Sequence, residues 1–383
     1  MLRMCTLSSV AVLCAAAVGA AYAADSRLQF KGDFETGLIQ PKRETHDGFF
    51  VKTLPHPQGS TTEVSIARGG GGPDSGLDTR VVRSDRVGSE TVQPRRGDYF
   101  VRSAVYRDKD YSRFKGNSGK NKPRSNIGMN GHDFDYDTEG YVGFSIYVPK
   151  NFENEVGKKG EQGKSMLLTI GAPSAETFFN LNVWVPTNDS EAHWFIRTNL
   201  NDQSVTEMHK GTVTQDIDLG KVAADKGKWT DFVVRFRSNP FSRDTNPAQK
   251  GINGAMNRMF EGNKGILQVW KAEGGEDSKG NRRMSLVLNK VNEPVGLVPH
   301  NSWQLDSSFR IYKHGWHLQP SSVKGPVWFG FDEIRFGLTG RDGTTYADVH
   351  PANLSCTDGC KGIPNSNYSP PLAPTEVTVS QAE

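Results

Sequence analysis

Residues 309–319 read Phe309-Arg-Ile-Tyr-Lys-His-Gly-Trp-His-Leu-Gln319, and their pattern is that of a β-strand. Side chains of a strand point alternately to its two faces. One face would carry Lys313, His317 and Gln319, whereas Arg310, Tyr312 and Trp316 would share the other. Gly315 would let a ligand or another backbone approach closely. We therefore predict a strand with a polar face that meets solvent or lines a polar cleft.

Short runs of alternating apolar residues recur along the chain on both sides of this stretch. They lie at residues 99–106, 141–148, 165–170, 178–185, 193–198, 229–237, 265–270, 284–288 and 327–336. Amphipathic helical patterns are nearly absent, and the 383-residue chain contains 41 glycines and 20 prolines, many of them between the runs. Antiparallel strands separated by such turns are typical of sandwiches. We predict an all-β, single-domain β-jelly-roll sandwich of the concanavalin-like type over residues 24–350.

Both ends of the chain are predicted to lie outside this domain. Residues 1–23 combine a basic start, an apolar run and the cleavage signal Ala21-Tyr22-Ala23, which is the pattern of a secretory signal peptide. No comparable apolar run follows, so we expect a secreted or periplasmic monomer without a membrane span. In an oxidising compartment, Cys356 and Cys360 would form a local disulfide. The end of the chain, residues 351–383, would then be pinned by this disulfide and finish in a disordered tail.

A basic, loop-like stretch at residues 107–124 includes Lys109, Arg113, Lys115, Lys120, Lys122 and Arg124. Such a run is usually a solvated face. Its proximity in sequence to Asn126 and His132 also predicts an anion-binding edge. The formal net charge of +3 is compatible with a polyanionic partner. The predicted export and the lack of a nucleic-acid-binding motif argue against nucleic acid.

Six segments together resemble a known family. They are Lys122-Pro-Arg-Ser-Asn126, Gly140-Tyr-Val-Gly-Phe-Ser-Ile-Tyr-Val-Pro149, Lys228-Trp-Thr-Asp-Phe-Val-Val-Arg-Phe236, Gly265-Ile-Leu-Gln-Val-Trp270, Tyr312-Lys-His-Gly-Trp-His317 and Val327-Trp-Phe-Gly-Phe-Asp-Glu-Ile-Arg335. Their order and spacing resemble those of the β-jelly-roll polysaccharide lyases, the group of heparin lyase I, glucuronan lyase and several alginate lyases. The resemblance implies β-elimination at a uronic acid of an acidic polysaccharide, such as alginate, glucuronan or a glycosaminoglycan, with no cofactor required for catalysis.

Such a lyase must neutralise the carboxylate beside the proton it removes, and Arg124 and Asn126 suit that role. Alternation places both on the same face of an extended segment. Relatives usually read Arg-x-Glu here, so Arg124 matches the family pattern and Asn126 departs from it. An amide can still donate a hydrogen bond to a carboxylate. The alternative is a surface turn with an incidental arginine.

The proton-transfer group is less clearly indicated by the family pattern. Relatives commonly have Lys-x-Gly-x-Tyr where this chain has Lys313, Gly315 and His317, and they use that tyrosine as acid or base. Three alternatives remain: His317 has taken over proton transfer with Lys313 beside it, Tyr312 or another tyrosine performs it, or the site is inactive.

Other residues are candidates for substrate binding rather than chemistry. Many relatives carry Gln-x-His on the strand that here spans residues 165–170, and both residues are absent. His132 or His193 could supply an imidazole from elsewhere, and Lys122 and Gln319 could bind substrate. Tryptophans that could stack on sugars, or form the core, are Trp184, Trp194, Trp270 and Trp316.

Asp33, Glu35 and Asp332 form a separate group near the ends of the predicted domain. First and last strands of jelly rolls often pair, and their carboxylates can bind a structural Ca²⁺. The alternative is a set of solvated carboxylates at strand ends.

Two other functional classes fit the predicted fold. A non-catalytic carbohydrate-binding protein would explain the missing Gln-x-His and tyrosine. A glycoside hydrolase needs two carboxylates facing each other in the cleft. The cleft candidates here are basic and amide residues, so the hydrolase ranks last.

Overall fold

The computed structural model describes part of the chain. The described residues are 28, 30–32, 49–53, 77–82, 85–87, 90–105, 124–129, 134–135, 138–152, 164–171, 177–201, 212–238, 265–275, 282–293, 295–296, 304–313 and 327–351. The signal peptide, Cys356, Cys360 and the tail lie outside them and stay predictions. None of the described helices is long and apolar enough to cross a membrane.

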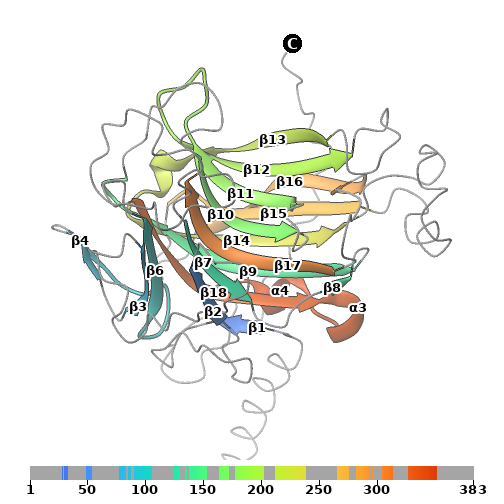
Figure 1. Cartoon of the computed structure of the whole chain (residues 1–383), viewed down its shortest axis with the longest axis horizontal. Coiled ribbons are helices and arrows are strands. Elements are labelled where there is room, and N and C mark those ends of the chain that lie inside the picture. The colour runs from blue at the N-terminus through green and yellow to red at the C-terminus, as the bar shows by residue number, and fades with distance from the viewer. Residues whose placement is uncertain are drawn as a thin grey trace, which may run out of the picture.

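Two antiparallel sheets lie face to face and confirm the predicted all-β jelly-roll sandwich (Figure 1). Sheet A has the order β16 (Arg283–Glu293), β15 (Gly265–Glu273), β14 (Lys228–Arg237), β9 (Glu139–Val148), β18 (Val327–Leu338), β6 (Phe100–Val105) and β3 (Leu77–Val82), with β1 (Phe30–Gly32) also paired to β18. The first and last described strands therefore pair, as predicted.

Sheet B carries most of the candidate site. Its order is β13 (Thr212–Lys221), β12 (His193–Asn201), β11 (Thr177–Trp184), β10 (Ser165–Gly171), β17 (Gln304–Lys313), β7 (Arg124–Met129) and β2 (Phe49–Thr53), and β8 (Phe134–Asp135) also pairs with β17. A separate two-stranded sheet joins β4 (Asp85–Val87) to β5 (Glu90–Val92). The short helices are η4 (Val222–Asp225), α3 (Thr339–Asp342) and α4 (Tyr346–Val349).

The apolar faces of both sheets form one core. Phe144 of β9 stacks on Phe232 of β14. Phe309 of β17, in sheet B, contacts the Phe144 ring edge-on. Trp194 of β12 is fully buried beside Phe232. Its indole N–H donates to Asp225 of η4 at 2.8 Å. The alternating apolar residues that predicted the strands are thus the residues that join the two sheets.

The outer face of sheet A is partly covered by the chain itself. Trp270 and Met284 pack there with Tyr346 and Val349 of α4. A Cβ added at Gly143 of β9 would lie 1.8 Å from the carbonyl oxygen of Val349, so only glycine admits this contact. Sheet A therefore has a face closed by aromatic and aliphatic packing.

Candidate active site

A row of directly opposed residues crosses the centre of sheet B. Arg124 of β7 is opposite Tyr312 of β17, Tyr312 is opposite Met166 of β10, and Met166 is opposite Asn182 of β11. Directly opposed residues of neighbouring antiparallel strands occupy the same face of the sheet. The registers therefore bring the Arg124 and Tyr312 positions together, next to each other on the outer face.

The register also relates the other predicted catalytic residues. Asn126 is opposite Arg310, one pleat along from the Arg124–Tyr312 pair and on the same face. Lys313 is opposite Ser165, which is opposite the buried Val183 of the core, so Lys313 occupies the alternate row of β17. The predicted Lys122, His132, Trp316, His317 and Gln319 lie outside the described residues. The roles proposed for all these residues stay predictions.

Three polar side chains lie on the outer face of β10 and β11: Asn182 within the central row, and Thr169 and Asn180 beside it. Thr169 is 8% exposed and donates its hydroxyl to Asn180 Oδ1 at 2.8 Å. Asn182 donates its Nδ2 to the backbone oxygen of Asn180 at 3.1 Å. The strand predicted to lack Gln-x-His thus presents Met166 and Thr169, and the neighbouring strand contributes two amides. We did not predict these amides, although the alternation Asn180-Leu181-Asn182 in the sequence was a usable signal.

An aromatic pair lies beside these amides on the same face. Trp184 stacks on Phe195 with ring centroids 3.6 Å apart and planes 9° apart. The Lys164 ammonium lies 4.9 Å from the Trp184 ring centroid, within range of a cation–π interaction. Trp184 is half-buried, whereas Trp194 and Trp270 are buried. Trp184 is therefore the tryptophan of these three with surface available to a sugar.

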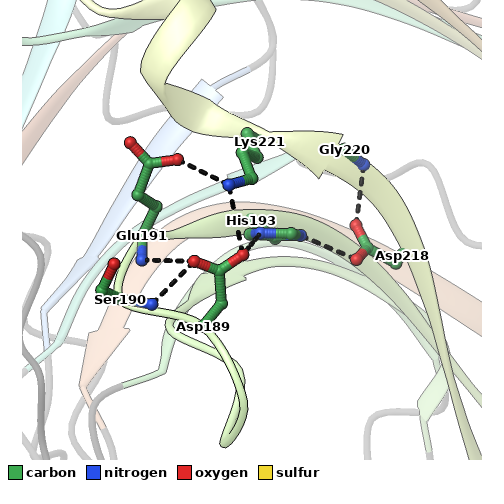
Figure 2. Close-up of polar contacts among 7 residues, drawn as sticks. All are labelled: Asp189, Ser190, Glu191, His193, Asp218, Gly220 and Lys221. Carbon is green, nitrogen blue, oxygen red and sulfur yellow. Dashed lines mark hydrogen bonds and ion pairs between the residues drawn. The ribbon is translucent and has the colours of Figure 1, made fainter.

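His193 lies at one end of this face within a network of charges (Figure 2). Its Nδ1 is 2.7 Å from Asp218 and its Nε2 is 2.9 Å from Asp189. Lys221 contacts Glu191 at 2.8 Å and Asp189 at 3.3 Å. The backbone N–H of Glu191, followed by the His193 ring, lowers the pKa of Asp189 below its usual range. Both ring nitrogens of His193 are therefore engaged by carboxylates, and its predicted substrate-binding role is untested.

The predicted calcium ligand Asp332 lies on β18 in sheet A, away from this face. Its carboxylate is buried and accepts the backbone N–H groups of Arg95 at 2.8 Å, Arg96 at 3.4 Å and Glu333 at 2.8 Å. Burial, followed by the charge of Glu333, raises the pKa of Asp332 well above its usual range. Calcium is bound by carboxylate, carbonyl and water oxygens, and both carboxylate oxygens of Asp332 already accept backbone N–H groups. Asp33 and Glu35 lie outside the described residues, and the calcium site stays a prediction.

The described part of the chain contains no group of three or more His, Cys, Asp or Glu side chains that could bind a metal ion. Its outer face on sheet B instead offers amides, hydroxyls, cations and an aromatic surface. This set of groups can bind a sugar chain through hydrogen bonds, stacking and charge attraction.

Comparison with known proteins places this chain in a family. A family model described as polysaccharide lyase matches residues 71–325, which is more than half of the chain. No curated protein sequence is significantly similar.

Several solved structures are similar at low sequence identity. The endo-β-1,4-glucuronan lyase of the fungus Trichoderma reesei is 14% identical, and the match covers 72% of this chain and 94% of that enzyme with a TM-score of 0.44. The exolytic PL7 alginate lyase AlyA5 of Zobellia galactanivorans is 7% identical, with 67% and 86% covered and a TM-score of 0.38. The alginate lyase of Klebsiella pneumoniae is 8% identical, with 69% and 95% covered and a TM-score of 0.35. Because the family model spans more than half of its length, the chain belongs to the polysaccharide lyase family and is a polysaccharide lyase.

Proposed function

We propose that this lyase cleaves a uronic-acid-containing polysaccharide by β-elimination on the outer face of sheet B. The observation that supports this most directly is the register that places Arg124 opposite Tyr312, with Asn126 one pleat further along β7. A carboxylate-neutralising cation and a group able to transfer a proton are thereby adjacent positions on one face. Elimination needs these two kinds of group close together.

The reaction breaks two bonds and forms a double bond. The C5–H bond breaks first or in concert, and its electron pair forms the C4=C5 double bond as the C4–O bond breaks. The departing oxygen takes a proton. Negative charge develops on the C5 carboxylate, so donors aimed at it stabilise the transition state. We assign this role to Arg124 and Asn126.

A positioned acid or base must remove the C5 proton and supply one to the leaving oxygen. We assign proton transfer to Tyr312, with Lys313 and His317 as the alternatives on the same segment of chain. Tyr312 ranks first because its position shares a face with Arg124, whereas Lys313 occupies the alternate row. As the phenolate, Tyr312 would take the C5 proton, and the neutral phenol so formed would give that proton to the departing oxygen.

The substrate is an acidic polymer such as alginate, glucuronan or a glycosaminoglycan, met by an exported enzyme. A net positive charge favours the approach of a polyanion, and this attraction weakens as salt is added. The carbohydrate-binding alternative is favoured by one observation: Met166 and Thr169 stand on β10 where many relatives carry Gln-x-His.

The test is to incubate the mature protein with a panel of acidic polysaccharides and to follow the ultraviolet absorbance of the new C4=C5 double bond. Arg124→Ala should lower kcat/KM by about 10²–10³-fold. Tyr312→Phe should lower it by about 10²–10⁴-fold if Tyr312 transfers the proton.

Arg341→Ala is the matched control, because Arg341 is 72% exposed on α3 beside sheet A. It should leave turnover unchanged. A full rate in Tyr312→Phe with loss in His317→Ala would move proton transfer to His317. Binding without any absorbance change, on every polymer tested, would replace the lyase proposal with the carbohydrate-binding one.

A further inference from the structure

Asn180 and Asn182 offer a natural comparison, because they are the same residue type on the same strand and the same face. Asn180 is 2% exposed, and its Oδ1 accepts the Thr169 hydroxyl at 2.8 Å. Asn182 is fully buried, and its Oδ1 has no hydrogen-bond partner among the described residues. The side-chain oxygen of Asn180 is thus paired within the protein. Asn182 is satisfied only on its donor side, through Nδ2 and the backbone oxygen of Asn180 at 3.1 Å.

A buried acceptor without a donor destabilises the folded state. Leaving such an oxygen unpaired costs about 1–3 kcal/mol, and nearly all buried polar groups in proteins find a partner. A leucine of similar size would avoid the cost at position 182. Ser165 and Trp270 also have a buried polar atom without a partner among the described residues, so the place of Asn182 on the sheet is what sets its oxygen apart.

The position of Asn182 indicates what its partner would be. It belongs to the cross-strand row that contains Arg124, Tyr312 and Met166. Strands lie about 4.8 Å apart, so Asn182 is about 10 Å from Tyr312 along this row. A sugar chain crossing the strands with its reacting unit at Tyr312 would place a neighbouring unit at Asn182.

The chemistry of the free atom limits the ligand further. A carbonyl oxygen accepts hydrogen bonds and repels a carboxylate, so Oδ1 suits a sugar hydroxyl rather than the acidic group of a uronate. Met166, opposite Asn182 on β10, and Trp184, two residues further along β11 on the same face, are both partly exposed, whereas Phe195, opposite Asn182 on β12, is buried. Solvent therefore approaches Asn182 from the side of Met166 and Trp184. Met166 is unbranched and flexible, and it can move to admit a hydroxyl.

We propose that Asn182 is a substrate-contacting specificity residue whose Oδ1 accepts a hydrogen bond from a hydroxyl of the sugar unit next to the one that is cleaved. This inference rests on the proposed elimination on the same face. It predicts an enzyme that distinguishes polymers by a hydroxyl at the neighbouring unit, in addition to the carboxylate at the reacting unit.

The test compares Asn182→Leu with Asn180→Leu. In Asn182→Leu the urea midpoint of unfolding should stay unchanged or rise, because an unpaired oxygen is removed. Its KM for the polymer should rise about 3–10-fold, the usual value of one hydrogen bond. Asn180→Leu should lower the midpoint instead, because the Thr169 hydroxyl loses its amide acceptor and keeps the weaker thioether of Met166 at 3.3 Å. Asn182→Ala, a smaller change, repeats the KM measurement if the leucine does not fit.

A second measurement separates a substrate contact from an indirect effect. A series of oligosaccharides would each carry one methylated hydroxyl on the sugar unit next to the cleaved one. For one member of the series, KM of wild type should rise to the value that Asn182→Leu has for the unmodified substrate. That modification should add no further loss in Asn182→Leu. Asn289→Leu, on β16 of sheet A, controls for the loss of an amide elsewhere and should leave KM unchanged.

Failure of this inference differs from failure of the proposed function. If wild type cleaves a polymer and Asn182→Leu has an unchanged KM, or is destabilised as Asn180→Leu is, Asn182 is structural and the lyase proposal stands. If wild type binds a polymer without cleaving it, the elimination proposal is wrong. In that case, a higher Kd in Asn182→Leu than in Asn180→Leu would assign Asn182 to polymer binding, and equal Kd values would make it structural. If wild type neither cleaves nor binds any polymer, both proposals are overturned.

Discussion

Two arginine–aspartate pairs with similar geometry lie on the outer faces of the two sheets. On sheet A, Arg95 donates to Asp231 through Nε at 3.1 Å and a terminal nitrogen at 2.9 Å. On sheet B, Arg197 donates to Asp216 in the same two-pronged way, both distances being 2.7 Å. The aspartate side chain is 3% exposed in the first pair and 31% exposed in the second. Burial of the aspartate, rather than bond length, distinguishes the two pairs. We call the outer face of sheet A, where Asp231 lies, the closed face and that of sheet B, where Asp216 lies, the open face.

The largest expected effect comes from breaking the pair on the closed face. Asp231 also accepts the Ser145 hydroxyl at 2.6 Å. Burial opposes its ionisation, but the charge and hydrogen bond of Arg95, with the Ser145 hydrogen bond, together lower the pKa of Asp231. Asp231→Ala removes the carboxylate that holds the largely buried Arg95 guanidinium, which should cost about 3–5 kcal/mol of unfolding free energy. Urea denaturation followed by circular dichroism measures this loss.

Asp216→Ala is the matched variant on the open face. It removes the same side chain from the same kind of pair. Arg197 is 13% exposed, close to the 11% of Arg95, but Asp216 is far more exposed than Asp231, so we expect a smaller loss than in Asp231→Ala. Equal losses of unfolding free energy in Asp231→Ala and Asp216→Ala would show that burial of the aspartate does not set the cost of breaking the pair.

A pH effect on the closed face should come next in size. His350 is buried after α4, and burial, partly offset by Asp231 and reinforced by Arg95 and Arg96, lowers its pKa to about 4. The pKa of a histidine in the unfolded chain is about 6.5. Because the unfolded chain takes up a proton below this pH and the folded protein does not until about pH 4, the folded state loses stability as pH falls from 6.5 to 4. Wild type should therefore lose about 3 kcal/mol between pH 6.5 and pH 4 that His350→Gln does not lose. Parallel stability curves for the two proteins would exclude this role of His350.

The contact between β9 and α4 offers a test of similar or smaller size. Gly143→Ala places a methyl group against the backbone of Val349, and opening a packed contact typically costs about 1–3 kcal/mol. Gly275→Ala is the control, because an added Cβ there meets nothing within 4 Å. The rate on polymer, measured at a temperature where both variants are folded, should be unchanged. A lower rate in Gly143→Ala alone would mean that the closed face also influences the site.

The sequence predicted the strands of the core well, because both apolar alternation and strand pairing act there. Residues 141–148 and 229–237 were expected as strands and form most of β9 and β14. β13 was missed. Its sequence, Thr-Val-Thr-Gln-Asp-Ile-Asp-Leu-Gly-Lys, alternates polar and apolar residues at an edge of sheet B, and its many polar groups resemble a loop.

The candidate site was predicted only where alternation alone was informative. Alternation placed Arg124 and Asn126 on one face of an extended segment, and it placed Tyr312 and Lys313 on opposite faces of their strand. The pairing of Arg124 with Tyr312 depends on a register between strands that are distant in sequence. The difference between Asn180 and Asn182 is still less visible, because both read as outward polar residues and only packing leaves one oxygen unpaired.

The smallest effect should come from the charge network around His193 on the open face (Figure 2). His193 is 12% exposed in its side chain, but Asp218, one of its partners, is 46% exposed, so water and salt can replace the contact. His193→Gln should therefore change the urea midpoint only slightly, and the change should vanish at high salt. If His193 binds substrate, as the sequence suggested, KM for the polymer should rise in this variant while stability stays constant. If its role is to tie the turn before β12 to the end of β13, KM should follow wild type, because Asp189 and Asp218 already occupy both nitrogens of the ring.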